Sequence, residues 1–319
     1  MIKIAIILVL LIARGNIHLS EGNLRPGFYK EECASAEEIV RGVVEGSVAR
    51  NPRNAAILLR LQFHDCFVGG CDASILLKRD GEDDESSAVG NAGVGGFEII
   101  DEAKAATEKA CPGVVSCADI VALAARDAVV TARGPHYEVP TGRRDGLTAE
   151  KMKAANLPDP QESIKTLKSK FREKGLSEKD LVILSAGAHT IGTVACFFVT
   201  QRLDSEDPTI DPTFFKMLRS TCPQGGDVNV RLPLDLGSSL TFDGHIFHNI
   251  KKGRGVIQSD AALYQDSDTK KIIDSLLSAN MTLKDHFFSD FSKSMVKMGS
   301  IGVKIGVEGE IRHQCNTTN

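Results

Sequence analysis

Apolar residues recur along most of the chain at the spacing of one helix face. Ile39, Val43 and Val44 lie three and four positions apart, behind a capping pattern that Ser35 and Glu38 supply. Asn51-Pro52 is a helix-start signal for the next apolar segment. Helical periodicity is found at 39–44, 54–64, 97–109, 117–131 and 267–299. The pattern predicts an all-α protein.

Polar and Gly-rich or Pro-rich stretches interrupt these helices. Residues 79–96 and 222–245 are predicted to be long irregular segments. Pro158-Asp159-Pro160 breaks the chain near its middle and predicts two lobes, at about 23–160 and 161–319. After this break, Ser177 and Asp180 form a capping pattern for a helix that is expected to run to His189.

The N-terminus has the composition of a signal peptide. Lys3 precedes an apolar run at 4–13, which is too short to span a bilayer. We therefore predict a signal peptide over 1–22 and a mature protein over 23–319, with a buried N-terminal helix as the alternative. No later run is long enough to cross a membrane, so a soluble, secreted product is expected.

Composition and cysteine usage agree with secretion. The 319 residues are 42% hydrophobic and carry a formal charge of -4 without a basic stripe, so nucleic acid is not an expected partner. Eight cysteines in an exported chain predict four disulfides, and roughly 105 connectivities are open. The sequence contains no CxxC pair, so the cysteines do not suggest a zinc site. Sequons at Asn280 and Asn316 are candidate glycosylation sites.

Arg60, Phe63 and His64 have the spacing of one helix face. A cation, an aromatic ring and an imidazole are costly to bury together without partners. One interpretation is a partly solvated helix end with a satisfied histidine. The other is a polar catalytic cluster above a cofactor.

The segment that follows His64 is rich in oxygen ligands. Asp65, Val68, Gly70, Asp72 and Ser74 are separated by steps of three and two, in a loop that a Cys66–Cys71 disulfide could close. Hard oxygen donors in a constrained loop suit calcium, although the pattern is not that of an EF-hand. A turn held by side-chain hydrogen bonds is the alternative.

His189 follows Ala186, Gly187 and Ala188 at the end of an apolar segment. Small neighbours would leave room for a flat, bulky group beside the imidazole, although a histidine in this setting is more often a core residue. Asp260 could accept a hydrogen bond from the second ring nitrogen, which would orient the ring and strengthen it as a ligand.

Two long motifs give the chain a family resemblance. LRLQFHDCFVGGCDASILL at 59–77 resembles the distal signature of class III secretory plant peroxidases, and LSAGAHTIG at 184–192 resembles their proximal signature. GRRD at 142–145, NLP at 156–158 and all eight cysteines also have family counterparts. The similarity extends from about residue 26 to 315. The resemblance implies an all-α fold, with one haem b between a distal and a proximal lobe, and two calcium ions.

Catalytic roles follow from the resemblance by position. His189 would be the axial iron ligand and Asp260 its hydrogen-bond partner. His64 would act as general base and then general acid on peroxide, while Arg60 stabilises the charge that develops. Asn91 would hold His64. The expected substrate-edge residue is Pro158.

The resemblance also implies ligand sets and disulfides. The first calcium ion would bind Asp65, Val68, Gly70, Asp72 and Ser74, with Glu85 beside it. The second would bind Thr190, Asp235, Ser238, Thr241 and Asp243. The implied disulfides are Cys33–Cys111, Cys66–Cys71, Cys117–Cys315 and Cys196–Cys222.

Four departures from the family pattern lie near these residues. The segment 93–97 after Asn91 is one residue short and lacks an arginine before Gly-Phe. Tyr137 stands where the family usually has Trp, Leu234 replaces an aromatic residue and Gln62 replaces a histidine. None of these changes removes a predicted catalytic group.

The leading hypothesis is a monomeric, secreted haem peroxidase of the extracellular space or cell wall, with the vacuole as another destination. Hydrogen peroxide would oxidise the haem by two electrons, and two molecules of a phenolic donor would restore it. The first alternative is a non-catalytic extracellular glycoprotein that binds haem and calcium. A zinc hydrolase is the remote third reading, because it needs three clustered ligands.

Overall fold

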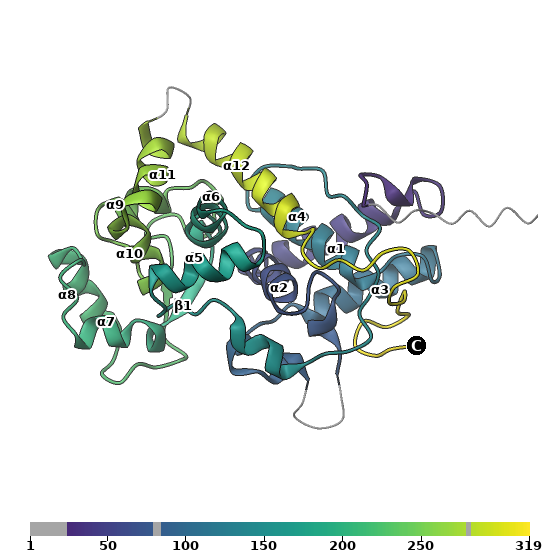
Figure 1. Cartoon of the computed structure of the whole chain (residues 1–319), viewed down its shortest axis with the longest axis horizontal. Helices are drawn as coiled ribbons and strands as arrows, with labels where there is room; N and C mark the ends of the chain where they lie inside the picture. The colour runs from purple at the N-terminus through teal and green to yellow at the C-terminus, as the bar shows by residue number, and fades with distance from the viewer. Residues whose placement is uncertain (1–23, 79–83, 279–281) are drawn as a thin grey trace, which may run out of the picture.

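Twelve α-helices and one short two-stranded sheet make up most of the structure, a computed structural model that describes residues 24–78, 84–278 and 282–319 (Figure 1). The predicted signal peptide and Asn280 lie outside the described residues. The helices are α1 (Ala36–Arg50), α2 (Asn54–Val68), α3 (Phe97–Ala110), α4 (Cys117–Thr131), α5 (Ile164–Glu173), α6 (Glu178–Val182), α7 (Thr200–Asp204), α8 (Pro212–Thr221), α9 (Ile246–Lys251), α10 (Gln258–Gln265), α11 (Ser267–Ser278) and α12 (Leu283–Met298). The expectation of a mainly helical fold is confirmed.

The first half of the chain packs around α4. Every residue of α4 from Cys117 to Val129 is buried, and the charged Asp119, Arg126 and Asp127 among them form ion pairs. α2 and α1 both lie against it, and α3 packs on α1 and α4. In Figure 1, α2 lies near the middle of the molecule, between this group and the helices of the second half. A rigid helix packed on a buried one fixes the residues of α2 in space.

The second half begins with α5 and α6 and ends with α12, which packs against the segment Ile183–Gly187. Beyond α12 the chain returns to the first half (Figure 1). There the backbone of Gly302 approaches Gly70 so closely that a Cβ on Gly70 would collide with it. The C-terminal segment thus presses directly on the loop after α2.

Four disulfides connect these parts: Cys33–Cys111, Cys66–Cys71, Cys117–Cys315 and Cys196–Cys222. They are the same pairs that the family resemblance implied. Cys117–Cys315 joins the start of α4 to the C-terminal segment, and Cys66–Cys71 closes the end of α2 on itself. The disulfides therefore fix the turn after α2 and tie the C-terminal segment to α4.

Several local predictions need correction. The helix predicted to run to His189 is α6 for only five residues, and it continues as a π-helix over Ile183–Gly187 and a 3-10 turn over Ala188–Thr190. The Ser177 capping box itself is present, with both of its hydrogen bonds. Ser35 makes no such side-chain cap, and α1 instead begins with two acidic residues in its first turn.

Two further corrections concern segments expected to be irregular. Asp65 and Val68 belong to the last turn of α2, so the oxygen-rich loop begins only at Gly69. Within 222–245 the chain forms β2 (Arg231–Pro233), which pairs antiparallel with β1 (Thr193–Ala195). This ladder is too short to produce a visible strand pattern in the sequence.

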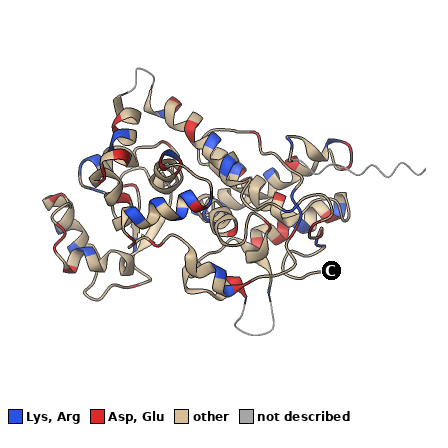
Figure 2. Cartoon of the chain, viewed as in Figure 1, with Lys and Arg blue, Asp and Glu red and all other residues tan. Residues whose placement is uncertain are grey.

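The charged residues are spread over the molecule, and its described helices are short or polar. Acidic and basic residues are interspersed over the helices (Figure 2). Across the described ranges, no helix combines the length and the apolar character that a bilayer span requires.

Candidate active site

The α2 face carries the predicted cluster. Arg60, Phe63 and His64 project from one side of the helix, one to two turns before its end at Val68. The His64 ring is only 5% exposed, and the Phe63 ring meets it edge-on with centroids 5.3 Å apart. The alternative of a solvated helix end is therefore wrong for His64, whereas the side chain of Arg60 is exposed.

Hydrogen bonds fix the tautomer of His64. Nδ2 of Asn91 donates to the carbonyl oxygen of Glu85 at 2.8 Å, so Oδ1 of Asn91 faces the ring, 2.7 Å from Nδ1 of His64. An amide oxygen only accepts, hence Nδ1 carries the proton and Nε2 keeps its lone pair. Nε of Arg60 donates to that Nε2 at 3.0 Å.

The surroundings keep this imidazole neutral. Burial, followed by the positive charge of Arg60, lowers the pKa of His64 to about 3. The ring is therefore a neutral acceptor over the ordinary pH range. The shortened segment after Asn91 leaves this arrangement intact, because Asn91 itself is 2% exposed and bonded on both sides of its amide.

Arg60 is held by the same segment. Its Nη1 and Nη2 donate to the carbonyl oxygens of Gly93 and Ala92, at 3.0 and 3.2 Å. All three acceptors of its guanidinium are neutral, so its charge is not compensated locally. Burial, and then the nearby charge of Arg231, lower the pKa of Arg60.

His189 lies in the 3-10 turn that follows the π-helix. Nδ1 of His189 is 3.1 and 3.2 Å from the two carboxylate oxygens of Asp260, which belongs to α10 and is fully buried. A carboxylate accepts from the ring, so Nδ1 is protonated and Nε2 carries the lone pair. The His189 side chain is 32% exposed, which leaves that nitrogen open to a ligand.

These features fit a haem. An accessible imidazole that donates its other N–H to a carboxylate is the usual protein ligand of a metal. The turn that carries His189 contacts α2, the helix of His64 and Arg60. The space beside Gly187 is filled by Phe287 of α12, which would lie 2.6 Å from a Cβ there. Gly187 therefore permits close packing with α12.

The first predicted calcium cluster contains unsatisfied oxygens. Oδ1 of Asp65, Oγ of Ser74 and Oε1 of Glu85 are buried without a hydrogen-bond partner. Burial raises the pKa of Asp65 well above its usual range and that of Glu85 to about 7. Buried, unpaired oxygen atoms of this kind are what a hard cation satisfies. Asp72 differs, since one of its oxygens pairs with Lys304 at 2.9 Å.

The remaining two residues of this set contribute backbone carbonyls. The Val68 carbonyl oxygen accepts from Nζ of Lys174 at 3.2 Å, and that of Gly70 accepts from the Asp72 amide at 2.8 Å. In the part of the chain that the structure describes, no three His, Cys, Asp or Glu side chains alone could hold a metal. A cation here would require hydroxyl and carbonyl oxygens as well, as calcium does.

The second predicted cluster is already hydrogen-bonded internally. Oγ1 of Thr190 lies 3.0 Å from Asp235 and 3.2 Å from Asp243, and Oγ of Ser238 makes a short hydrogen bond to Asp243. The fifth residue, Thr241, donates its backbone N–H to the carbonyl oxygen of Ser238. The structure thus brings this set together, beside His189 through its neighbour Thr190.

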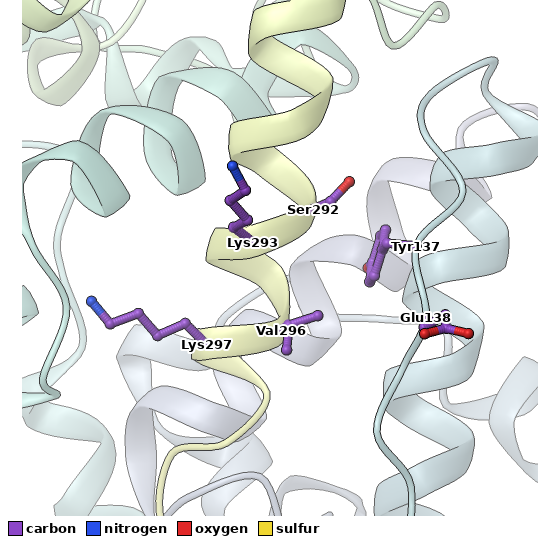
Figure 3. A pocket seen from close by; sticks show the side chains of 6 residues that line it. All are labelled: Tyr137, Glu138, Ser292, Lys293, Val296 and Lys297. Carbon is purple, nitrogen blue, oxygen red and sulfur yellow. The ribbon is translucent and has the colours of Figure 1, made fainter. Parts of the chain in front are cut away.

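The departures from the family pattern have local consequences. Tyr137 is 7% exposed, its hydroxyl has no hydrogen-bond partner, and burial raises its pKa. It borders a hollow of 370 Å³ between the segment after α4 and α12 (Figure 3). Oε1 of Gln62 is likewise buried without a partner, and Leu234 is buried. Pro158 is half-buried, just after the 3-10 turn Lys151–Asn156.

Comparison with known proteins identifies the family. The sequence model described as Peroxidase matches residues 40–279, and Peroxidase 13 of Arabidopsis thaliana is 66% identical over the full length of both chains. The chain belongs to the class III plant peroxidase family. Peroxidase 43 of Arabidopsis thaliana is 54% identical over 94% of each chain. Peroxidase N1 of Nicotiana tabacum is 44% identical over 99% of this chain and 97% of its own.

The family relationship makes this protein a peroxidase enzyme, and it implies haem as cofactor with hydrogen peroxide and a reducing donor as substrates. The recognition made from the two motifs is thereby confirmed. Arg231, which lies near Arg60, was not among the predicted site residues. The only signal in the sequence was an arginine within a segment that looked irregular.

Proposed function

We propose that this peroxidase reduces hydrogen peroxide to water and oxidises phenols and other small one-electron donors, with one haem b on His189. The observation that carries the proposal is the state of His64. Its proton is fixed on Nδ1 by Asn91, and its Nε2 lone pair points to Arg60. Few settings other than acid–base catalysis need a buried, neutral histidine beside an arginine.

The haem, when bound, supplies the two-electron chemistry that cleaves the O–O bond. Nε2 of His64 accepts a proton from one oxygen of hydrogen peroxide and returns it to the other oxygen, which leaves as water when the O–O bond breaks. Arg60 cannot lose its charge at working pH and stabilises the negative charge that develops on the departing oxygen. Asn91 keeps the proton on Nδ1, so that Nε2 is always the acceptor.

On the other side, Asp260 polarises His189. A carboxylate that accepts from Nδ1 makes the imidazole more anionic and a stronger electron donor through Nε2. The buried position of Asp260 strengthens this effect, because water does not screen it. Pro158 is proposed to line the edge where donors approach.

Two calcium ions complete the proposal. Asp65, Val68, Gly70, Asp72 and Ser74, with Glu85 nearby, would bind the first, and the unpartnered oxygens of three of them support it. Thr190, Asp235, Ser238, Thr241 and Asp243 would bind the second. Each set includes the residue that directly follows a functional histidine, so each ion would stiffen one side of the site.

Secretion is part of the proposal as well. Four disulfides within one chain are typical of proteins that fold in an oxidising compartment. They support export through a signal peptide at 1–22 to the extracellular space or cell wall. Asn316 is exposed, as a glycosylated asparagine must be. The protein is proposed to act as a monomer, with the haem between lobes at about 23–160 and 161–319.

The test is a steady-state assay of the purified, calcium-loaded haem protein with hydrogen peroxide and a phenol such as guaiacol. Oxidation that requires both peroxide and haem is the expected result. A correctly folded haem protein that oxidises no phenolic donor would overturn the proposal in favour of a non-catalytic haem- and calcium-binding glycoprotein. His136→Leu, at an exposed histidine whose side chain makes no hydrogen bond or ion pair with the described residues, serves as a control for purification effects.

A further inference from the structure

Arg231 occupies a defined position next to the proximal segment. It begins β2 and pairs with β1, which starts four residues after His189. Its guanidinium is exposed, and it donates from Nε to Oγ1 of Thr193 at 3.1 Å and from Nη2 to the Thr193 carbonyl oxygen at 2.7 Å. Two bonds to one residue hold the guanidinium by one edge and leave the Nη1 end free.

The same place adjoins the distal helix. Gly192, directly before β1, lies against α2, since a Cβ at Gly192 would be 2.9 Å from Cβ of Ala56. Ala56 is four residues before Arg60 and shares its helix face. Arg231 therefore stands where β1 meets the face of α2 that carries Arg60. The effect of the Arg231 charge on the pKa of Arg60 agrees with this proximity.

Neither arginine has an acidic partner within the described residues. Arg60 donates only to His64, Ala92 and Gly93, and Arg231 donates only to Thr193. The buried arginines of the described chain each lie beside a carboxylate, whereas Arg60 and Arg231 are exposed; the pairs are Arg126 with Asp127, Arg143 with Asp119, Arg202 with Asp207 and Arg312 with Asp145. Two nearby positive charges, neither paired with a carboxylate, create a potential that favours an anion.

We propose that Arg231 is a carboxylate-binding residue at the edge of the haem site, on the side shared with Arg60. The inference rests on the proposed function, because it takes the haem to bind between His64 and His189. A carboxylate matches the planar, forked donors of a guanidinium, and the free Nη1 end of Arg231 offers that fork. The carboxylate has two possible sources, a haem propionate or the acid group of a donor such as a hydroxycinnamate.

The experiment compares Arg231→Gln and Arg231→Lys with wild type, all as calcium-loaded haem proteins. Arg172→Gln is the matched control, because Arg172 is also exposed and makes no ion pair with the described residues. The first measurement is the rate of haem transfer to excess apomyoglobin. The second is KM for 4-hydroxycinnamate and for its uncharged methyl ester. The glutamine variant removes the charge, and the lysine variant keeps the charge without the fork.

A propionate partner predicts that haem loss from Arg231→Gln is about tenfold faster than from wild type, as the loss of one charge-assisted hydrogen bond implies. A donor partner predicts that KM for 4-hydroxycinnamate rises about tenfold while KM for the ester is unchanged. In either case the affected quantity, the rate of haem loss or KM for 4-hydroxycinnamate, should lie between the values of Arg231→Gln and wild type in Arg231→Lys. In Arg172→Gln it should match wild type.

The proposal is overturned if both Arg231 variants retain haem and discriminate between the acid and its ester as wild type does. That result differs from a failure of the proposed function, which would appear as a wild-type protein without peroxide-dependent activity. Far-UV circular dichroism shows whether each variant keeps the secondary structure of wild type. If Arg231→Gln does not fold, Arg231→Lys alone decides the matter, since the fork is lost while the exposed cation remains.

Discussion

The two histidines that we propose as functional have the same side chain in different environments. His64 is 5% exposed, and its Nδ1 faces the neutral amide of Asn91. His189 is 32% exposed, and its Nδ1 faces the buried carboxylate of Asp260. Burial and then the charge of Arg60 lower the pKa of His64 to about 3, although the hydrogen bond to Asn91 acts in the opposite direction, whereas an anionic partner increases the donor strength of His189. The surroundings of each ring, and not the imidazole itself, separate the proposed acid–base role from the proposed ligand role.

The backbones that carry them differ as well. His64 lies on a regular α-helix packed on the buried α4, so its position relative to Arg60 is fixed. His189 lies in a 3-10 turn that directly follows a π-helix, so the winding of the chain changes within the eight residues Ile183–Thr190. π-helical segments often occur at functional sites. The distal side is therefore set by one helix, and the proximal side by contacts between several segments.

The largest effect is expected when the distal base is removed. His64→Leu should lower the rate of reaction with hydrogen peroxide by about 10²–10⁴-fold, the usual contribution of a positioned acid–base group. The haem should remain bound through His189. Stopped-flow absorbance measures the rate, and His136→Leu is the control at an exposed site. A loss of less than threefold would contradict the assigned role.

The proximal partner should matter less, because it acts through another residue. Asp260→Asn replaces the carboxylate with a neutral amide, like that on the distal side. We expect the peroxide reaction to slow by about 10–100-fold, as for other partners of metal ligands. The iron–histidine stretching frequency in a resonance Raman spectrum should fall at the same time. An unchanged frequency would show that Asp260 does not polarise His189.

The reverse exchange places an anion on the distal side. Asn91→Asp should raise the pKa of His64, because a carboxylate stabilises the protonated ring. The rate with peroxide needs neutral His64, so the wild-type rate should fall only as pH drops through about 3. In the variant the fall should begin at higher pH, with about tenfold loss at pH 5. Coincident pH–rate profiles would refute the role of Asn91.

Removal of calcium should affect the two sides unequally. The first cluster leaves three buried oxygens without partners, while the second is hydrogen-bonded within itself. Treatment with a chelator should therefore slow the peroxide reaction several-fold, by loosening the segment that positions Asn91, before it disturbs ligation by His189. If the iron–histidine stretching frequency changed before the peroxide reaction slowed, the proximal side would be the more sensitive to calcium, contrary to this prediction.

The calcium-free protein should also have a distinctive pH dependence. Burial raises the folded-state pKa of Glu85 from its usual value to about 7. A carboxyl group with a raised folded pKa stabilises the fold at low pH, and this contribution is lost as pH rises through 7. Thermal unfolding with chelator should thus show lower stability at pH 8 than at pH 5.5. Added calcium should reduce that difference.

Local sequence patterns predicted many of the helices but few of the contacts between segments that are distant in the sequence. The bounds of α3 and α4 follow from periodicity and caps within a residue or two, since these are properties of adjacent residues. The π-helix before His189 was missed; its Gly187 packs against Phe287, a contact far along the chain that no local pattern encodes. The spacing also could not reveal that Asp65 stays within α2.

The site was predicted mainly through the family resemblance. Arg60 and His64 share a helix face, so spacing alone suggested their cluster. Asn91 and Asp260 are 27 and 71 residues from the histidines they bond, and no local pattern encodes such distances. Arg231 was missed for the same reason, because its position depends on a strand pair and on a close contact between Gly192 and α2.

The most direct test of the central claim is the absorbance spectrum of the wild-type haem protein before and after one equivalent of hydrogen peroxide. The account predicts a ferric haem band that shifts within the mixing time to an oxidised intermediate and returns when a phenol is added. In His64→Leu the same band should be present and should respond only slowly. A wild-type haem band that ignores peroxide would contradict the claim that His64 and Arg60 activate peroxide above a haem on His189.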